Sequence, residues 1–266
     1  DADPYLLGQR CLAVAASDLA AMGAAPMGFT LGLTLSQAQP EWLKAFSEGL
    51  ESMAAYCGLR LAGGDTTRGP LAISVTVMGH VPQQQALTRR GAQVGDLLCV
   101  GGSLGDGAGA LPLVLGEPRE WSADEVWLLD RFWAPQPQLA LGLALRGRAT
   151  SAMDISDGLL ADCGHLAKAS KVQLRIEQQQ LPLSEALCAV TGEQAVRYAL
   201  CGGDDYRLVF TAPAEHVAAL QAEGWSVQVI GNVVEGTGVQ LLHAGLPIDA
   251  PGSGFLHFTH GTETAT

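Results

Sequence analysis

Four short acidic motifs stand out because each places carboxylates beside small residues. They are "AASDLAAMGA" with Asp18, "AGGDTTRG" with Asp65, "MDISDGL" with Asp154 and Asp157, and "CGGDDY" with Asp204 and Asp205. A neighbouring glycine or serine lets a ligand approach the backbone, and all-oxygen ligand sets suit hard cations such as Mg²⁺. The motifs therefore predict a polyphosphate site at which metal ions neutralise the bound anion.

Each motif also has a simpler structural explanation. Asp18 suits the end of a helix, Asp65 with its two threonines suits an Asx turn, and Asp157 suits the N-cap of a helix. Asp204 and Asp205 suit a loop with two solvated acids. Four independent turns explain the motifs less well than one shared site does, so we favour the shared site and leave each alternative open.

The composition is compatible with that site and excludes other classes. The chain of 266 residues has 27 acidic and 15 basic residues, a net charge of −12, and 48% hydrophobic residues. A folded protein of this charge is a poor partner for nucleic acid or an anionic membrane. Six cysteines are scattered without a C-x-x-C pair, and no apolar run approaches the roughly 20 residues that cross a bilayer. We therefore expect a cytoplasmic protein with reduced cysteines.

Two further features give weaker signals. The stretch "GGSLGDGAG" suits either a phosphate cradle at a helix N-terminus or a plain strand-to-helix turn, and it lacks the G-K-[ST] ending of a P-loop. The six histidines show no zinc-binding spacing, and no nucleophile elbow or Cys–His pair is evident. Covalent catalysis is therefore not indicated.

The periodicity of apolar residues predicts the elements that hold the motifs. Helices are expected from Pro4 and from Pro40 to Gly58, and strands over 29–35 and on both sides of "LAGGDTTRG", which is itself expected to be a turn. A second series of strands and helices begins after a boundary near residues 91–95. The pattern indicates an α/β protein with domains at 1–92 and 93–266.

The motifs in this order resemble the thiamine-monophosphate kinase family, in the superfamily of aminoimidazole ribonucleotide synthetase. The resemblance also rests on "ALTRRGAQVGD" and runs from Asp1 to about Phe258. It implies a two-domain fold whose N-terminal sheet pairs across a homodimer and whose C-terminal domain is α/β. It also implies transfer of the γ-phosphoryl group of ATP to thiamine monophosphate, giving thiamine diphosphate.

The resemblance assigns roles to individual residues. It implies several Mg²⁺ ions on four carboxylates, ATP contacts at three further positions, and substrate contacts at two. The metal ligands are Asp18, Asp65, Asp154 and Asp157, the ATP contacts are Gly64, Arg89 and Ser156 together with Asp65, and the substrate contacts are Asp204 and Phe255. We expect no covalent nucleophile and no general base.

The sequence departs from the family pattern in three places. Ala15 replaces a usual asparagine, and Asp204 replaces a usual glutamate, which shortens its reach by one methylene. Family members also have an N-terminal segment with an acidic nucleotide and metal motif that this sequence lacks. We therefore expect an incomplete metal cage and doubtful activity for the chain as written.

Two alternatives to the kinase stay open. One is another ATP-using enzyme of the superfamily, such as selenophosphate synthetase or a hydrogenase maturation factor; the latter ends in a cysteine, whereas this chain ends "GTETAT". The other is a non-catalytic protein that binds a magnesium nucleotide.

Overall fold

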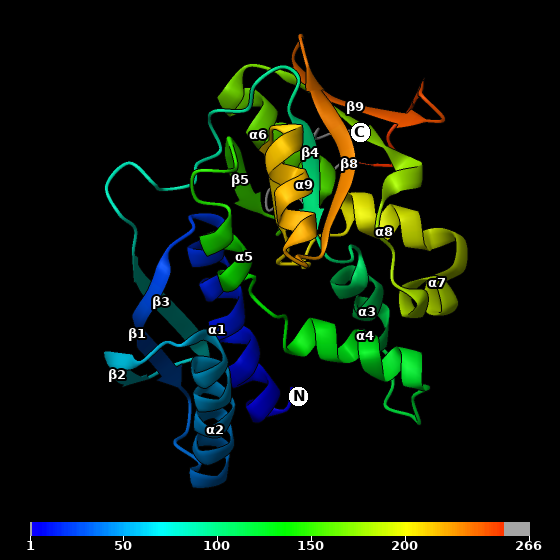
Figure 1. Cartoon of the computed structure of the whole chain (residues 1–266). Helices are drawn as coiled ribbons and strands as arrows, with labels where there is room; N and C mark the ends of the chain where they lie inside the picture. Colours follow the sequence, from blue (N-terminus) through cyan, green and yellow to red (C-terminus); the bar gives the residue numbers. More distant parts are fainter. Residues whose placement is uncertain (1, 253–266) are drawn as a thin grey trace, which may run out of the picture.

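In the computed structural model, which describes residues 2–252, the strands form a three-stranded and a seven-stranded sheet (Figure 1). The first part of the chain contains α1 (Pro4–Ala21), β1 (Ala25–Leu35), α2 (Pro40–Cys57), β2 (Leu61–Arg68) and β3 (Ala72–His80). The second contains β4 (Leu97–Gly101), α3 (Asp106–Leu115), α4 (Ala123–Trp133), α5 (Leu139–Ala144), β5 (Ser151–Asp154), α6 (Leu159–Ser170), β6 (Gln173–Glu177), α7 (Glu185–Thr191), α8 (Ala195–Cys201), β7 (Leu208–Ala212), α9 (Ala214–Ala222), β8 (Val227–Val234), β9 (Gly238–His243) and β10 (Leu246–Ile248).

Helix α1 begins at Pro4, and α2 begins at Pro40 and ends before Gly58, as the sequence predicts. The Asp3 side chain caps α1 by accepting a hydrogen bond from the Tyr5 N–H at 2.8 Å, and α2 ends at Gly58 in a left-handed conformation. The two helices pack almost backbone to backbone, since a Cβ added at Gly49 would lie 1.9 Å from the Tyr5 carbonyl oxygen. This packing fixes α1, which carries Asp18.

The three-stranded sheet has the order β2-β1-β3, and one prediction about it is wrong. The motif "LAGGDTTRG" is not a turn, because residues 61–68 form strand β2, parallel to β1 and exposed along its whole length. A Cβ added at Gly64 would lie 2.0 Å from the Leu31 carbonyl oxygen, so close pairing with β1 by itself requires glycine there.

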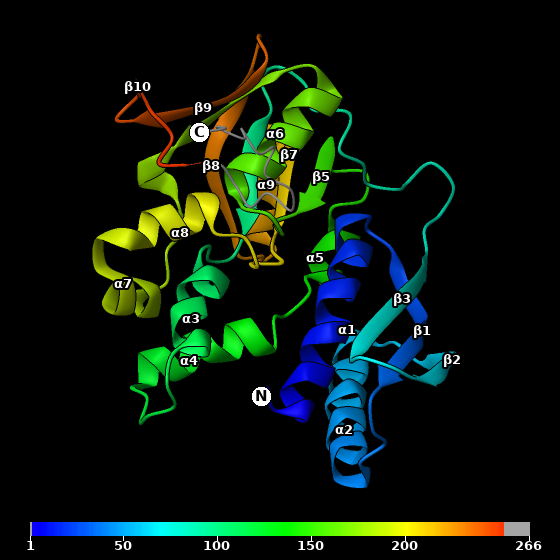
Figure 2. The same cartoon turned by 180° about the vertical axis from the view of Figure 1, so that it is seen from behind.

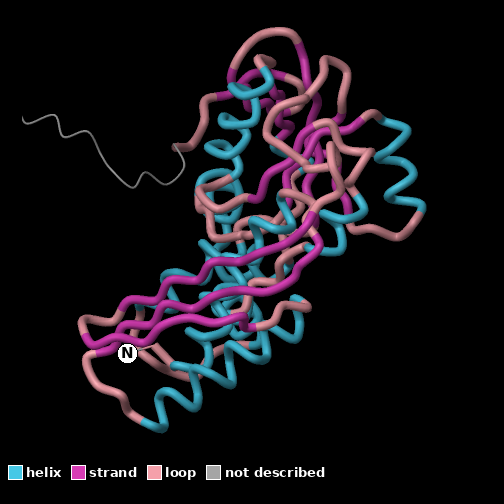
Figure 3. The backbone as a smooth tube through the Cα atoms, turned by 90° about the vertical axis from the view of Figure 1, so that its left-hand side faces the viewer, coloured by secondary structure: helices cyan, strands magenta, loops and turns pink. Residues whose placement is uncertain are grey.

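Alternation along the strands decides which way Asp65 points. Leu31 and Leu33 of β1 belong to the core against the helices, and their β2 partners are Gly64 and Thr66. Asp65 pairs with Gly32 and therefore lies on the opposite face, which no described helix covers (Figure 3). Asp65 thus points away from α1 and α2.

The seven-stranded sheet, of order β10-β9-β6-β8-β4-β7-β5, is covered on both faces. Leu98 and Val100 of β4 face the cluster that includes α6 and α8, whereas Cys99 faces the cluster that includes α5 and α9. Figure 1 shows α9 over one face and Figure 2 shows α6 over the other. Helices α3, α4 and α7 form a further layer with their own small core.

The two parts of the chain meet along α1 and α5. A Cβ added at Gly142 would lie 2.2 Å from the Ala20 carbonyl oxygen, and Nε of Arg146 donates to the Gly23 carbonyl at 2.5 Å. This contact brings the end of α1 beside the end of β5, so Asp18 and Asp154 become neighbours although 136 positions separate them in the sequence (154 − 18).

Candidate functional site

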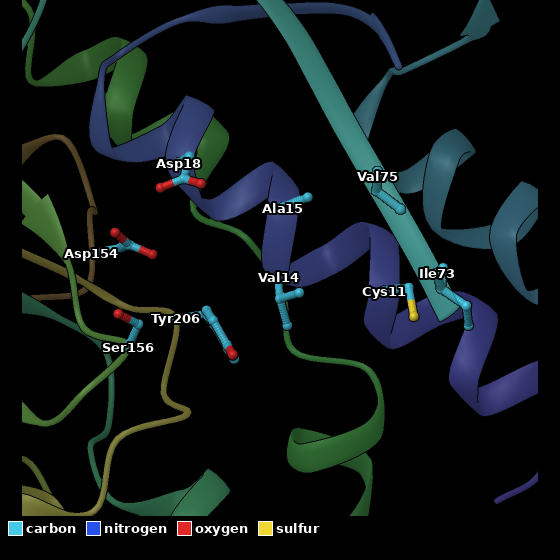
Figure 4. A pocket seen from close by; sticks show the side chains of 9 residues that line it. All are labelled: Cys11, Val14, Ala15, Asp18, Ile73, Val75, Asp154, Ser156 and Tyr206. Carbon is cyan, nitrogen blue, oxygen red and sulfur yellow. The ribbon is translucent and has the colours of Figure 1, made fainter. Parts of the chain in front are cut away.

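A cavity of about 390 Å³ lies between α1, β3 and the segments that follow β5 and precede β7. Asp18, Asp154 and Ser156 line its polar end, and Tyr206 lies beside them (Figure 4). Its other end is apolar, with Cys11, Ile73 and Val75 as the principal side chains. The cavity can therefore hold a ligand with one charged and one apolar part.

The carboxylates of Asp18 and Asp154 form the electrostatic centre of this cavity. Partial desolvation and then the charge of Asp154 raise the pKa of Asp18. Burial raises the pKa of Asp154, and the nearby Asp157 carboxylate adds to that rise. Two acids that are costly to ionise together suit a bound cation, which would relieve both the desolvation and the repulsion.

Ser17 fixes the orientation of Asp154. Its hydroxyl donates to Oδ2 of Asp154 at 2.7 Å, and both side chains are buried. This hydrogen bond joins α1 to β5 and leaves Oδ1 of Asp154 for a ligand. It therefore connects the two parts of the chain at the site itself.

Asp162 on α6 holds the loop that follows Asp154. One of its carboxylate oxygens accepts the backbone N–H groups of Ser156 at 3.0 Å and Asp157 at 3.1 Å. Burial raises the pKa of Asp162 to about 7. Asp157 itself is not the cap of α6, because Gly158 occupies that position.

Arg89 lies in the connection between β3 and β4 and is exposed. Its positive charge lowers the pKa of both Asp18 and Asp154, opposing the larger effect of desolvation. The Ser170 hydroxyl donates to the Arg89 carbonyl at 3.0 Å, which ties this connection to α6. Arg89 is therefore placed to meet an anion bound beside the two carboxylates.

Asp204 lies in a strained loop at the edge of this cavity. Asp204 and Tyr206 both have positive φ, of 59° and 48°, which is unusual for non-glycine residues. Oδ1 of Asp204 pairs with Nη2 of Arg10 at 2.9 Å and accepts the Tyr206 hydroxyl at 2.8 Å. The Asp204 N–H donates to the Ser156 carbonyl at 3.0 Å, so this loop and the Asp154 loop support each other.

Three predicted site residues are not in this cluster. Asp65 and Gly64 lie on β2 and do not line the cavity. Phe255 lies outside the described residues. Within residues 2–252, no three His, Cys, Asp or Glu side chains lie close enough together to hold a metal ion by themselves.

Comparisons with known proteins identify the family. The family model for the AIR synthase related protein, N-terminal domain, matches residues 1–81, and that for the C-terminal domain matches residues 93–243. Thiamine-monophosphate kinase of Escherichia coli K12 is 42% identical over 97% of this chain and 82% of its own length. The chain belongs to the thiamine-monophosphate kinase family.

Solved structures agree with this membership. Thiamine-monophosphate kinase from Stenotrophomonas maltophilia K279a is 43% identical with a TM-score of 0.86, over 92% of this chain and 80% of that one. AaThiL complexed with AMPPCP and TMP is 31% identical with a TM-score of 0.88, over 97% and 82%. The predicted AIR synthetase-like α/β fold is thereby confirmed.

Sequence reasoning missed four residues that shape the site in this family member. Ser17, Arg10, Asp162 and Tyr206 each contact a predicted site residue directly. Ser17 and Tyr206 lie inside the quoted motifs, so their position was a usable signal. Arg10 carries no local signal, because only tertiary packing brings it to Asp204. Asp162 lies five residues after Asp157, so its contact is local and its proximity was also a usable signal.

Proposed function

We propose that the chain transfers the γ-phosphoryl group of ATP to thiamine monophosphate, giving thiamine diphosphate and ADP. The observation that carries the proposal is the Asp18–Asp154 pair, held by Ser17 at a cavity between the two parts of the chain. Thiamine-monophosphate kinases at 42% identity and AaThiL in complex with AMPPCP and TMP support the same reaction.

The donor set fits Mg²⁺. Asp18 and Asp154 offer carboxylate oxygens whose charge the protein neutralises only in part, and Asp157 is within electrostatic range of Asp154. When bound there, Mg²⁺ supplies the positive charge that offsets repulsion between ATP and a phosphate acceptor. Since no three of these side chains meet at one point, we assign Asp18, Asp154 and Asp157 to several Mg²⁺ ions, whose remaining ligands would be phosphate oxygens of the reactants.

The remaining residues position the reactants for in-line transfer. A phosphate monoester has its second pKa near 6, so the acceptor is already largely dianionic at neutral pH and needs no general base. Arg89 presents a guanidinium fork to phosphate oxygens, and Ser156 presents a hydroxyl beside Asp154. Catalysis then depends on orientation and electrostatics.

The orientation of Asp65 supports a homodimer. Asp65 lies on the uncovered face of the three-stranded sheet, which is polar and includes Thr34, Thr67 and Ser74. If two such faces pair in a dimer, Asp65 of one protomer lies near the site of the other protomer, although it points away from the site of its own protomer. We propose that Asp65 and Gly64 contact the metal and nucleotide of the partner subunit.

The substrate ring is assigned to the Asp204 side of the cavity. Arg10 and Tyr206 hold Oδ1 of Asp204, which leaves Oδ2 to accept hydrogen bonds from substrate directly or through water. Phe255 has the flat face needed to stack on a heteroaromatic ring. We also propose a domain boundary near residue 92, which the ends of the two matched family regions support.

A cytoplasmic location is the last part of the proposal. The free thiols of the cysteines support it. Separately, none of the described helices is long and apolar enough to cross a membrane.

The decisive experiment incubates the protein with ATP, Mg²⁺ and thiamine monophosphate and detects products by mass spectrometry. We expect thiamine diphosphate and ADP, no product from free thiamine, and no turnover after chelation of Mg²⁺. Product from free thiamine would redirect the assignment to another kinase. ATP binding without any product would favour the non-catalytic alternative.

A further inference from the structure

A second cavity, of about 630 Å³, lies on another side of the molecule and shares no lining residue with the Asp18 cavity. It opens where the end of α2 and the start of β1 face the α4–α5 connection and the turn before β8. Its walls are mainly apolar, with Tyr56 and Trp225 as the aromatic side chains. Among the described residues that line it, Arg207 alone carries a full charge at neutral pH.

Arg207 is an arginine without an acceptor. Within residues 2–252 its guanidinium forms no ion pair, and no hydrogen bond from its side chain is found. Burial, and then the positive charge of Arg131, lower the pKa of Arg207. Among the described residues no Arg207 nitrogen is both buried and without a partner, so its donors face solvent in the cavity, where a bound anion would accept from them.

The carboxylates of Asp205 and Asp106 oppose the fall in the pKa of Arg207, but neither accepts a hydrogen bond from it in the described part of the chain. The guanidinium lies close to Gly102, whose added Cβ would be 3.6 Å from Nε of Arg207. The adjacent Gln138 amide is already used, since Nε2 donates to the Gly101 carbonyl at 2.9 Å and Oε1 accepts the Leu208 N–H at 2.8 Å. The Gln138 side chain is therefore not free to accept from Arg207.

Arg131 adds a second unsatisfied cation. Arg131 and Arg207 both line a narrow crevice that adjoins the cavity at Gln136. Nε of Arg131 is buried without a hydrogen-bond partner, the one such side-chain atom in the described part of the chain. Its guanidinium lies over Trp127, at 4.6 Å from the ring centroid. Two guanidinium groups therefore line the same crevice, and Nε of Arg131 has no hydrogen-bond partner there.

Three acids line the crevice, and each accepts from a group other than Arg131 and Arg207; Oδ1 of Asp204 pairs with Arg10. Oδ1 and Oδ2 of Asp106 accept the hydroxyls of Ser184 at 2.6 Å and Ser103 at 2.5 Å. Both oxygens of Asp205 accept the Gly105 N–H, at 2.8 and 2.9 Å. Neither acid forms an ion pair with Arg131 or Arg207. The carboxylates are committed to holding loops.

We propose that this cavity binds a small planar aromatic compound with one oxyanion group, the oxyanion on Arg207 and the ring against Tyr56 and Trp225. The planar fork of arginine matches phosphate and carboxylate geometry, and aromatic walls favour a flat ring. The volume lies within the usual range for small-molecule sites. The binding does not depend on the kinase assignment.

The site has a direct route to the candidate substrate residue. Arg207 follows Asp204 by three positions in the strained loop, and the Arg207 carbonyl accepts the Ile155 N–H at 2.8 Å next to Asp154. A ligand that moves Arg207 on binding would therefore also shift the backbone of both loops of the Asp18 cavity. This coupling, unlike the binding, rests on the proposed function.

The test uses phenyl phosphate as probe, with EDTA present so that Mg²⁺-dependent binding at the Asp18 cavity is absent. Calorimetry should show saturable binding to the unmodified protein, and Arg207→Gln should weaken it about 10-fold to 100-fold, as for a lost charged hydrogen bond. Arg131→Gln should weaken it less. Arg175→Gln, at an exposed position on β6, is the matched control and should change nothing.

Other arms separate this site from the Asp18 cavity. Asp154→Asn should leave phenyl phosphate binding unchanged, whereas loss of binding in that variant would place the probe at the wrong cavity. Inorganic phosphate and benzoate distinguish the oxyanion type, and inorganic phosphate binding as tightly as phenyl phosphate would overturn the role of the aromatic walls. Equal binding by Arg207→Gln and the unmodified protein would overturn the proposal. Arg207→Lys, which keeps the charge without the fork, replaces the glutamine variant if the latter does not fold, and should also bind more weakly.

Discussion

In the three-stranded sheet Asp65 stands exposed on an uncovered face, whereas in the seven-stranded sheet Asp154 ends a strand that is buried along its whole length. Within residues 2–252 the one hydrogen bond to the Asp65 side chain comes from the Thr66 N–H at 2.9 Å, whereas Asp154 accepts a hydrogen bond from Ser17. The buried carboxylate therefore belongs to a preformed half of the site. The exposed carboxylate of Asp65 can contribute to a site only if a second protein surface covers that face of the sheet.

The largest effect is expected from Asp154→Asn. Turnover should fall by about 10²–10³-fold, the range seen when one electrostatic stabiliser is removed. The apo protein should keep or gain thermal stability, because the amide removes a buried charge whose pKa the fold raises. Kinetics and thermal melts of the same preparation test both statements, and near-normal turnover would refute the assignment of Asp154.

Asp65→Asn should also lose turnover, but without a change in melting temperature, because the side chain is exposed. If Asp65 serves the partner subunit, mixing the inactive Asp65→Asn and Asp154→Asn proteins should restore about one quarter of the activity, since half of the dimers are mixed and each holds one intact site. No recovery after verified subunit exchange would mean that both residues act in one protomer.

Ser17→Ala tests how far the preformed half depends on its hydrogen bond. We expect the affinity for Mg²⁺ to fall by about 10-fold to 100-fold, as for other residues that orient metal ligands. The Mg²⁺ concentration at half-maximal rate should rise, which a purely structural role would not cause. Ser47→Ala, at an exposed position of α2, is the matched control.

Gly64→Ala tests why β2 has a glycine at this position. The glycine is needed either for close pairing with β1 or to leave space for a bound nucleotide. The added Cβ meets the Leu31 carbonyl at 2.0 Å, so we expect about 1–3 kcal/mol of destabilisation in the apo protein. In Gly32→Ala the new Cβ would be 3.6 Å from the Ser74 Cβ, an ordinary contact, and stability should be nearly unchanged. Urea unfolding measures both, and an unperturbed Gly64→Ala would leave nucleotide clearance as the better explanation.

Asp205 is expected to affect stability alone, through a dependence of the unfolding free energy on pH. Burial raises its pKa from 3.8 to about 8, so its contribution to stability is greatest below pH 4 and is lost as the pH rises through 8. The slope for one proton is at most about 1.4 kcal/mol per pH unit. Asp205→Asn should flatten the unfolding free energy between pH 5 and pH 8, and an unchanged profile would contradict the assignment.

Much of the fold was predictable because its signals are local. The apolar residues of α2 recur at helical spacing, and Pro40 and Gly58 marked its ends, so the sequence predicted that helix. The turn expected at residues 61–69 was wrong, because two glycines and two threonines are also compatible with an edge strand. Pairing with β1 makes this segment a strand, and that pairing depends on residues outside the segment.

The candidate site divides in the same way. The sequence by itself determined which residues have the chemistry, since the type and spacing of Asp18, Asp154 and Asp157 are properties of short motifs. Only the tertiary structure decided that Asp18 and Asp154 meet, that Asp65 points away, and that Arg131 and Arg207 converge without an acceptor. The physical reason is that helix contacts, strand register and face alternation depend on residues far apart in the chain, whereas motifs record only their neighbours.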